Sequence, residues 1–554
     1  MRKIRIILFG ILILAFLLRF WGVWGQDLFG DEAVDAFRAI GYVDYLGTSF
    51  QTTPLEWYKS QPLPWWSKLS FHDLPPLGIL IMNFFFRVFG DSLLVARLPA
   101  IIVGVLSAYL LYLIVKKLFE DEALALFSAL FFAVNGALVW VFRLSMLEPI
   151  LLFFILLNIH LFLQFLENKR KWWLWGISLG LVALTKYTGV FIVPVYLTYW
   201  TYKTIRTDWA YLFAALILAL LMFSPVLVYN FYLYQTTGHF DLQFAYVFGQ
   251  ETPEWTGSVG KTQAPFPDLW RNLAVQRWDA KTNSIFPVGY YGISAMLAIL
   301  AGIVYSIFVF AKNRSKGILF FWLYIFFLTL LLVKIGSAHR FLTLYGPAFA
   351  VFVGFLSAAL WSFKKSKWSY ALKALMIGFF AWEIIHSINT NFIRYPDYGM
   401  AKLDRYFEEE FAGKESAVIP ESDNSHLNDL TYKFALRKSK NADRELRMIV
   451  YNDNVALPTL EWIFYRRFFY HSTPALYLEN FYKALNSGQD YGKFQFYFVQ
   501  STENTILNPF KKDKTIALKF ESYLLSKGLQ PEKIIYGKNG LPMFRVYKFT
   551  IFDI

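Results

Sequence analysis

The chain has 554 residues, of which 56% are hydrophobic and 20% aromatic, while only 17% carry a charge. Soluble domains carry about 25% charged residues, so this composition indicates an integral membrane protein. The absence of cysteine excludes disulfide bonds and thiolate catalysis, and it leaves the redox compartment open.

The net charge of +14 is distributed unevenly along the chain. From residue 397 onward, 22 Lys and Arg stand against 20 Asp and Glu, a net charge of +2; the preceding residues hold 32 against 20, a net charge of +12. The basic excess therefore belongs to the apolar part, where the bias of Lys and Arg toward cytoplasmic loops explains it. No nucleic-acid partner is expected.

Residues 1–388 are predicted to form an all-α polytopic membrane domain with about eleven transmembrane helices. A span needs about 20 apolar residues, and two of the segments, 172–184 and 190–200, form a short pair broken between them. The predicted segments are 4–24, 92–115, 123–142, 149–165, 172–184, 190–200, 210–232, 288–310, 318–333, 341–361 and 370–388.

The orientation of these segments follows from the basic residues. Arg2, Lys3 and Arg5 precede the first segment, and no small-residue cleavage site closes it, so an uncleaved anchor with a cytoplasmic N-terminus is expected. Alternation from there places every dense basic cluster in the cytoplasm. These clusters lie at 116–117, 169–171, 203–206, 312–316 and 364–367. The chain is thus predicted to be a multi-pass protein of the plasma or inner membrane.

Two long loops and the C-terminal region are placed outside the cell by the same alternation. The first loop, 26–91, is rich in Trp, Tyr and Pro, as is typical of membrane interfaces, and residues 77–89 within it are expected to form an interfacial helix. The second external loop runs over 234–286.

Residues 389–554 are predicted to form an extracytoplasmic α/β domain, because charges are frequent and short apolar runs alternate with amphipathic ones. Strands are predicted at 416–419, 447–451, 495–499 and 544–549, and helices at 404–411, 460–470, 474–485 and 519–527.

Two adjacent carboxylates, Asp31 and Glu32, follow the first apolar segment directly. An ionisable group at a membrane face is costly unless it is used, so Asp31 is a candidate catalytic base at the outer membrane surface. The alternative is that both acids cap a surface helix over 33–46, since acidic side chains favour helix N-termini.

Four further polar residues fall on the same predicted side of the membrane: Glu148, Lys186, His339 and Arg340. Lys186 interrupts a helical pair, and irregular backbone at membrane depth is tolerated only where it is buried in protein or lines a cavity. Alternatively, Glu148 caps a helix that begins at Pro149, since acidic side chains and proline suit the first turn of a helix. Likewise, Arg340 could extend its guanidinium to lipid headgroups. Their convergence is a hypothesis, because a sequence does not define which helices are neighbours.

Arg97, His72 and Asp73 are weaker candidates. Arg97 lies early in the second segment and is expected either to bind phosphate or to pair with Glu148. His72 and Asp73 are the weak candidates for metal ligation, but a metal requires three or four ligands, so no metal site is predicted.

This set of residue types favours an anionic lipid substrate and a hydroxyl acceptor. Basic side chains hold a phosphate, and a carboxylate takes the proton of an attacking hydroxyl. The sequence contains no P-loop, dinucleotide fingerprint or zinc helix motif, so a soluble nucleotide donor is not expected.

Six stretches, in their order and spacing, resemble the GT-C superfamily of polyprenyl-phosphate-sugar-dependent glycosyltransferases, most similarly the protein O-mannosyltransferase and lipid A aminoarabinose transferase group. They are Phe29-Gly30-Asp31-Glu32-Ala33, His72-Asp73-Leu74-Pro75-Pro76-Leu77, Val88-Phe89-Gly90-Asp91-Ser92 with Ala96-Arg97-Leu98-Pro99, Arg143-Leu144-Ser145-Met146-Leu147-Glu148-Pro149, Leu184-Thr185-Lys186, and His339-Arg340-Phe341-Leu342 with Tyr345-Gly346-Pro347.

The resemblance implies roles for individual residues. Asp31 would be the general base, and Glu32 would orient it or the acceptor. The donor would be a sugar on dolichyl or undecaprenyl phosphate, whose phosphate leaves with inversion at the sugar. Lys186 and Arg340 would stabilise the leaving phosphate, with Arg97 as a weaker candidate.

The resemblance further implies an acceptor hydroxyl on a protein, a lipid or an envelope glycan, contact with membrane lipids, and no obligatory cofactor; a divalent metal is compatible with it but not favoured. Glu148 and His339 complete the expected substrate-binding set. Two departures are visible: Asp73 and Leu74 stand where relatives continue directly from His to Pro-Pro, and Phe341 replaces a frequent Tyr.

Two other functions fit parts of the sequence. Intramembrane charges and broken helices also mark transporters, so a flippase for lipid-linked sugars without chemistry is the alternative function. A C-terminal binding module on a membrane anchor is the third, although eleven spans exceed what an anchor needs.

Overall fold

The computed structural model divides into two compact units, each built from segments that are not contiguous in the sequence. The helical unit consists of Met1–Val23, Trp65–Ile81 and Leu93–Tyr395, and the mixed unit consists of Trp24–Pro64, Met82–Ser92 and Pro396–Ile554. The structure describes residues 2–47, 52–203, 209–250, 265–274, 290–363, 368–435, 443–452, 454–486, 491–508 and 515–554.

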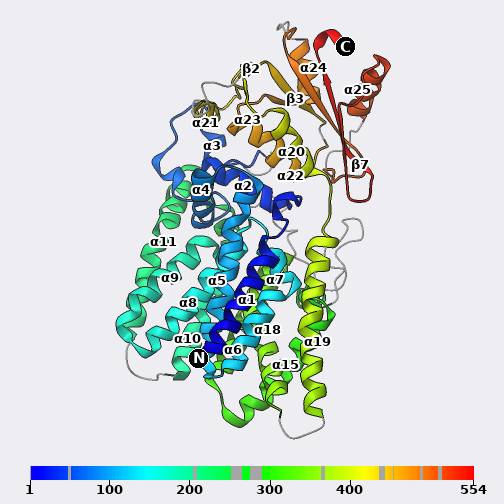
Figure 1. Ribbon diagram of the computed structural model, residues 1–554. Helices are drawn as coiled ribbons and strands as arrows, with labels where there is room; N and C mark the ends of the chain where they lie inside the picture. Colours follow the sequence, from blue (N-terminus) through cyan, green and yellow to red (C-terminus); the bar gives the residue numbers. More distant parts are fainter. Residues whose placement is uncertain are drawn as a thin grey trace. The chain divides into compact units, whose positions relative to one another are not determined.

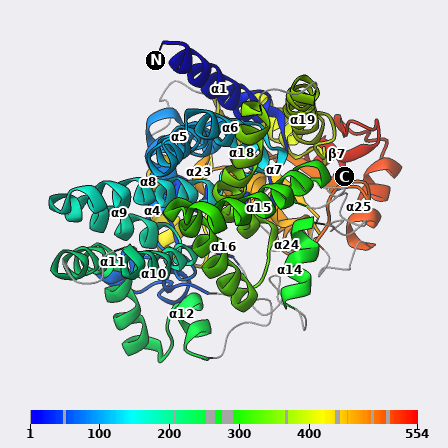
Figure 2. The same ribbon diagram turned by 90° about the horizontal axis from the view of Figure 1, so that it is seen from below.

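The helical unit is a bundle of long apolar helices (Figures 1 and 2). Its longer helices are α1 (Arg2–Phe20), α5 (Leu93–Phe119), α6 (Glu122–Val134), α8 (Leu147–Glu167), α9 (Trp172–Thr185), α10 (Ile192–Lys203), α11 (Trp209–Thr237), α15 (Ile293–Asn313), α16 (Lys316–Ile335), α18 (Gly346–Ser362) and α19 (Trp368–Ile388). Shorter helical pieces are η2 (Trp65–Lys68), α7 (Gly136–Val141), η3 (Lys169–Lys171), η4 (Tyr187–Phe191), α12 (Leu242–Val247), α14 (Pro265–Ala274), α17 (His339–Leu342), η6 (Thr343–Tyr345) and η7 (Asn389–Ile393).

All eleven predicted segments are helical at their centres, and in the described parts of the chain eight helices are long and apolar enough to cross a membrane. The other three, α6, α9 and α10, have 13, 14 and 12 residues, fewer than a full span needs. The eight are Arg2–Gly25, Leu93–Phe119, Leu147–Glu167, Trp209–Thr237, Ile293–Asn313, Lys316–Ile335, His339–Ser362 and Trp368–Ile393. The chain is therefore a multi-pass membrane protein.

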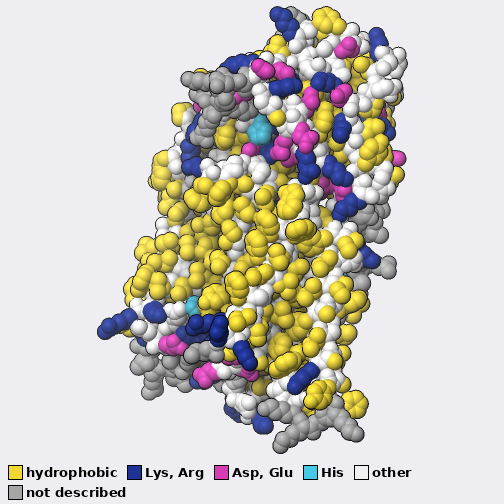
Figure 3. All heavy atoms as spheres, in the orientation of Figure 1, with side chains coloured by type: hydrophobic (Ala, Val, Ile, Leu, Met, Phe, Trp, Pro, Cys, Tyr) yellow, Lys and Arg dark blue, Asp and Glu magenta, His cyan; other side chains and the backbone are white. Residues whose placement is uncertain are grey.

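Hydrophobic side chains cover the face of the helical unit shown in Figure 3. Inside the bundle, small residues permit close helix packing, as is common between membrane helices. A Cβ on Gly302 of α15 would lie 2.1 Å from the carbonyl oxygen of Phe352 in α18, so only glycine fits there. Asn135 ends α6, and its Oδ1 accepts the Ala137 N–H at the start of α7 (3.2 Å), which splits the predicted segment 123–142 into two helices.

The mixed unit contains helices and a sheet. Its helices are α2 (Gly30–Gly41), α3 (Pro54–Trp57), α20 (Met400–Glu410), α21 (Ser425–Ala435), α22 (Leu457–Thr459), the π-helix η8 (Leu460–Tyr465), α23 (Arg466–Tyr470), α24 (Leu478–Leu485), α25 (Thr515–Ser526) and η9 (Ile551–Asp553). Its strands are β1 (Lys414–Ser416), β2 (Asp443–Glu445), β3 (Arg447–Tyr451), β4 (Ala475–Tyr477), β5 (Gln495–Ser501), β6 (Lys533–Tyr536) and β7 (Pro542–Phe549). Helix α4 (Leu77–Phe89) and the turn η1 (Val23–Gly25) contribute residues to both units.

The main sheet has the order β4-β3-β5-β7-β6. Strand β3 is parallel to β4 and β5, while β7 is antiparallel to β5 and β6. Aromatic side chains of β5 and β7 pack with α24 and α25 in one buried core, which includes Phe481, Phe496, Phe498, Phe520 and Phe549. Burial of these rings stabilises the α/β arrangement.

The predicted strands at 447–451, 495–499 and 544–549 are confirmed as β3, β5 and β7. The helix predicted over 474–485 is wrong at its start, because Ala475–Tyr477 pairs with β3 as β4 and the helix begins only at Leu478. Strands β2 and β6 and helix α21 were not predicted. Two parts of the second external loop expected over 234–286, residues 251–264 and 275–286, lie outside the described residues.

Part of the predicted first external loop belongs to the mixed unit, together with the C-terminal region. The Asp27 carboxylate accepts the Ala401 N–H at the start of α20 (2.8 Å), and the Tyr470 hydroxyl donates to the Phe37 carbonyl oxygen of α2 (2.9 Å). These bonds join segments more than 370 residues apart. The domain boundary expected between residues 388 and 389 falls inside the continuous helix α19–η7. The last segment of the helical unit ends at Tyr395.

Candidate active site

Three charged residues that the sequence singled out meet inside the helical unit. The Glu148 carboxylate, in the first turn of α8, accepts a hydrogen bond from Lys186 Nζ (2.5 Å), and Arg340 Nε lies 3.5 Å from the same oxygen. The residues come from three elements far apart in the sequence. We call Glu148, Lys186 and Arg340 the cation cluster.

Lys186 occupies its position because the helix stops just before it. Helix α9 ends at Thr185, Lys186 is extended (φ −163°, ψ 136°), and η4 begins at the next residue. The turn is tight: a Cβ on Gly189 would lie 2.4 Å from Val182 Cγ1 and 2.8 Å from Leu151 Cδ1. Only glycine closes this turn without displacing its neighbours, so the backbone fixes the lysine.

Arg340 is placed by a second break in the helical pattern. Helix α16 ends at Ile335 and is followed by Gly336, which has φ +108°, and the four-residue helix α17 carries His339 and Arg340. The Phe341 ring lies beside both cations, with its centroid 5.1 Å from Lys186 Nζ and 5.2 Å from Arg340 Cζ. The ring face contributes cation–π attraction to the cluster.

The cation cluster carries one buried anion and two partly accessible cations. The side chain of Glu148 is 2% exposed, whereas those of Lys186 and Arg340 are 18% and 23% exposed. The formal charges of these three residues sum to +1. A lysine and an arginine that lie together at a partly desolvated position suit a phosphate ligand.

His339 is half-buried at the edge of this region. Its ring lies 6.3 Å from that of Tyr290, whose hydroxyl is 2.5 Å from Thr343 Oγ1. Arg97 is fully buried, and its guanidinium donates to the Val23 carbonyl oxygen (2.5 Å), which holds the end of the first span.

The two weak metal candidates lie in the loop before α4. His72 is buried and its carbonyl oxygen accepts the Leu242 N–H (2.9 Å), while Asp73 is partly exposed. Within the described residues, no three His, Cys, Asp or Glu side chains lie together in a way that could hold a metal ion.

Asp31 and Glu32 lie in the mixed unit at the beginning of α2. The helix begins at Gly30, three residues earlier than predicted. Glu32 is fully buried and its Oε2 accepts the Phe29 N–H (3.0 Å), so this carboxylate caps the helix. Asp31, in the same turn, is half-buried.

Asp241, which was not predicted from the sequence, contacts the turn that carries Lys186. Its carboxylate is fully buried and accepts hydrogen bonds from the Tyr187 hydroxyl (2.7 Å) and from Asn230 Nδ2 (2.9 Å). Its other oxygen accepts the N–H groups of Gln243 and Phe244 at the start of α12. Because Tyr187 directly follows Lys186, Asp241 braces the turn that carries the lysine. From the sequence, the polar residue Asn230 within an apolar helix could have indicated a buried polar partner such as Asp241.

Burial raises the pKa of Asp241 from 3.8 to about 6, although its hydrogen bonds oppose the shift. A carboxyl group whose pKa is raised on folding contributes stability below pH 3.8 that is lost as the pH rises through 6. We expect this loss to amount to about 3 kcal/mol. Thermal unfolding of the wild type and Asp241→Asn between pH 4 and pH 7 measures it: the stability of the wild type relative to the variant should fall with pH, and a constant difference would contradict the assignment.

A second unpredicted carboxylate lies within the bundle. Glu383 of α19 is fully buried and accepts hydrogen bonds from Asn135 Nδ2 (3.0 Å) and Ser294 Oγ (2.7 Å). It joins α19 and α15 to the break between α6 and α7. A lone acid in an apolar segment was a detectable signal, and its satisfied hydrogen bonds indicate a structural role.

The sequence is similar to known mannosyltransferases over part of its length. Residues 73–229, which include Glu148 and Lys186, match the family described as dolichyl-phosphate-mannose-protein mannosyltransferase. Protein O-mannosyl-transferase 1 of Mus musculus is 34% identical over 105 residues, covering 17% of this chain and 14% of the mouse protein. Dolichyl-phosphate-mannose–protein mannosyltransferase 4 of Candida albicans is 31% identical over 149 residues, covering 22% and 20%. The chain thus matches a fifth or less of the length of these relatives.

Solved structures share the fold over the whole chain. The archaeal oligosaccharyltransferase AglB of Archaeoglobus fulgidus, in complex with an inhibitory peptide and a dolichol-phosphate, superposes with a TM-score of 0.54 at 13% identity, covering 100% of this chain and 75% of AglB. ArnT of Cupriavidus metallidurans, bound to undecaprenyl phosphate, superposes with a TM-score of 0.51 at 12% identity, covering 99% and 98%. This membrane protein therefore has the fold of GT-C glycosyltransferases and is similar, in residues 73–229, to the dolichyl-phosphate-mannose-protein mannosyltransferase family.

Proposed function

We propose that the protein transfers a sugar from a polyprenyl-phosphate donor to a hydroxyl acceptor on the extracytoplasmic side of the membrane. The observation that carries the proposal is the cation cluster, in which two cations, Lys186 and Arg340, lie at one oxygen of a buried carboxylate. Such a group suits a phosphate that gains negative charge as its bond to the sugar breaks.

In the proposed reaction, the acceptor hydroxyl oxygen attacks the anomeric carbon of the sugar. The new carbon–oxygen bond forms as the bond from the anomeric carbon to the phosphate oxygen breaks, and its electron pair leaves with the polyprenyl phosphate. Asp31 takes the hydroxyl proton, and the configuration at the anomeric carbon inverts. Lys186 and Arg340 stabilise the departing phosphate, while Glu148 holds both cations in place.

Known proteins support the choice of donor. AglB and ArnT, which share the fold, hold dolichol-phosphate and undecaprenyl phosphate in their solved structures, and the matched family is described by a dolichyl-phosphate-mannose donor. The proposed acceptor is a hydroxyl of a protein, a lipid or an envelope glycan. The proposal requires no metal or other cofactor.

Product analysis with the purified full-length protein tests this function. The protein is incubated with undecaprenyl-phosphate mannose carrying a labelled sugar, with an envelope extract as acceptor source, and free undecaprenyl phosphate is measured by mass spectrometry. We expect equimolar release of lipid phosphate and labelled acceptor. In proteoliposomes, translocation of the intact labelled lipid without release of lipid phosphate would favour the flippase instead.

A further inference from the structure

The mixed unit contains a cavity of about 190 Å³ that the proposed reaction does not use. Its walls come from the end of α2, the last turn of α4 with the following residues, α21 and the end of α23. Aromatic and charged side chains alternate around it: Phe86, Arg87, Asp91, Lys433, Phe434 and Tyr470.

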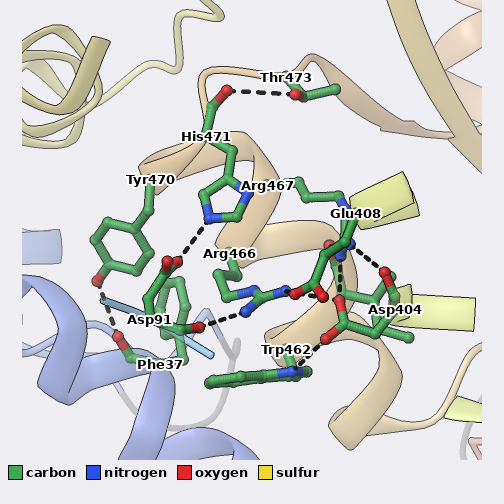
Figure 4. A network of polar contacts seen from close by, with 11 residues as sticks. Phe37, Asp91, Asp404, Glu408, Trp462, Arg466, Arg467, Tyr470, His471 and Thr473 are labelled. Atoms are coloured by element: carbon green, nitrogen blue, oxygen red, sulfur yellow. Dashed lines mark hydrogen bonds and ion pairs between the residues drawn. The ribbon is translucent and has the colours of Figure 1, made fainter. Parts of the chain in front are cut away.

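Internal bonds hold the walls of the cavity in place (Figure 4). Tyr470 donates to the Phe37 carbonyl oxygen (2.9 Å), and its ring lies 4.8 Å from that of Phe434 in an edge-on contact. The Asp91 carboxylate and His471 Nε2 are 2.6 Å apart, and Arg466 Nη1 donates to the Asp91 carbonyl oxygen (2.5 Å). The cavity is thus preformed, which lowers the ordering cost of binding a ligand.

The first turn of α21 is also anchored within the mixed unit. Asn424 Nδ2 donates to the Leu55 carbonyl oxygen (2.9 Å), and the Ser425 N–H donates to the Lys59 carbonyl oxygen (2.9 Å). The helix that carries Lys433 is therefore fixed against the loop segment 52–64.

The cavity is lined by two cations, Arg87 and Lys433, that do not pair with the one carboxylate among the described residues of its wall, Asp91. Arg87 and Lys433 are exposed, and neither has a hydrogen bond or ion pair with another described residue. Burial tends to raise the pKa of Asp91, but His471 and Arg466 outweigh it and hold that pKa below its ordinary value. Asp91 is therefore ionised, and its charge is engaged by His471 and Arg466 instead of by the two cations at the cavity.

Large apolar side chains are exposed on the helix that carries Arg87. Phe84, Val88 and Phe89 of α4 are 60%, 55% and 60% exposed, and Arg87 lies among them. Cations beside exposed apolar side chains on one helix are typical of elements that lie in the membrane interface.

We propose that this cavity binds the phosphate of an anionic lipid headgroup through Arg87 and Lys433. The guanidinium fork pairs with two phosphate oxygens, the ammonium supplies a second charge, and the acyl chains lie against Phe84, Val88 and Phe89. The site is independent of the proposed function, because none of the residues that line it has a role in the proposed sugar transfer.

The test measures lipid binding to the full-length protein purified in detergent. The probes are phosphatidylglycerol, phosphatidylcholine and soluble glycerol 3-phosphate. We expect the wild type to prefer phosphatidylglycerol, and Arg87→Gln/Lys433→Gln to bind it about 30-fold more weakly, since each basic residue near an anionic lipid contributes about 1 kcal/mol. The matched control, Lys483→Gln/Lys527→Gln, removes two lysines elsewhere in the mixed unit and should leave binding unchanged.

A second variant separates a cavity from general surface attraction. Leu430 lines the cavity without contributing charge, so Leu430→Trp should fill the space and weaken phosphatidylglycerol binding while both cations remain. Unchanged binding in either Arg87→Gln/Lys433→Gln or Leu430→Trp would overturn the proposal. Binding of glycerol 3-phosphate as tight as that of phosphatidylglycerol would also overturn it, because a free phosphate would then be the ligand.

Discussion

Replacing Asp31 with asparagine is expected to lower the rate of sugar transfer by about 10²–10⁴-fold, the usual contribution of a general base. The amide keeps the shape of the carboxylate but accepts no proton. Asp31 is half-buried and its neighbour Glu32 caps the helix, so the variant should fold normally. Transfer is measured as labelled acceptor formed per minute at saturating donor.

A matched control for this prediction is Asp423→Asn. Asp423 is an exposed carboxylate of the same unit that pairs with Lys59 on the surface, so its loss should leave transfer unchanged. Binding of undecaprenyl phosphate to the Asp31 variant should stay close to that of the wild type. Transfer at the wild-type rate in Asp31→Asn would remove this residue from its proposed role.

Replacing Lys186 with methionine is expected to reduce turnover by about 10²–10³-fold, the cost of removing one group that stabilises developing negative charge. Methionine fills similar space but leaves Glu148 with Arg340 as its remaining partner in the cation cluster. Lys334→Met, which removes an exposed lysine at the end of α16, is the matched control and should retain full turnover.

A double variant separates structure from chemistry at Lys186. In Lys186→Met, Glu148 keeps Arg340 as its partner, whereas Lys186→Met/Glu148→Gln also removes the carboxylate that pairs with Arg340. Lys186→Met/Glu148→Gln should therefore unfold at a lower temperature than Lys186→Met alone and remain as inactive. Recovery of transfer in the double variant would show that Lys186 serves only to satisfy Glu148.

The sequence identified the charges of the cation cluster but not their geometry. Glu148, Lys186 and Arg340 were detectable because ionisable groups are rare in apolar segments. That Lys186 and Arg340 share one oxygen of Glu148 depends on how α8, the break after α9, and α17 pack, and no local pattern encodes this. Asp241 escaped notice because a carboxylate in a polar loop looks ordinary until the fold buries it.

The errors in the mixed unit have the same origin. Ala475–Tyr477 has no strong strand pattern of its own and becomes β4 by pairing with β3. Conversely, β3, β5 and β7 were recognisable because each is a run of β-branched and aromatic residues. The membership of Trp24–Pro64 and Met82–Ser92 in the mixed unit rests on distant contacts such as Asp27 with Ala401, which only a three-dimensional structure reveals.

The most direct measurement is an experimental structure of the wild-type protein with undecaprenyl phosphate bound. We expect the lipid phosphate to lie within hydrogen-bond distance, about 2.7–3.2 Å, of Lys186 Nζ and the Arg340 guanidinium. A phosphate bound elsewhere, with no contact to Lys186 or Arg340, would contradict the proposed role of the cation cluster.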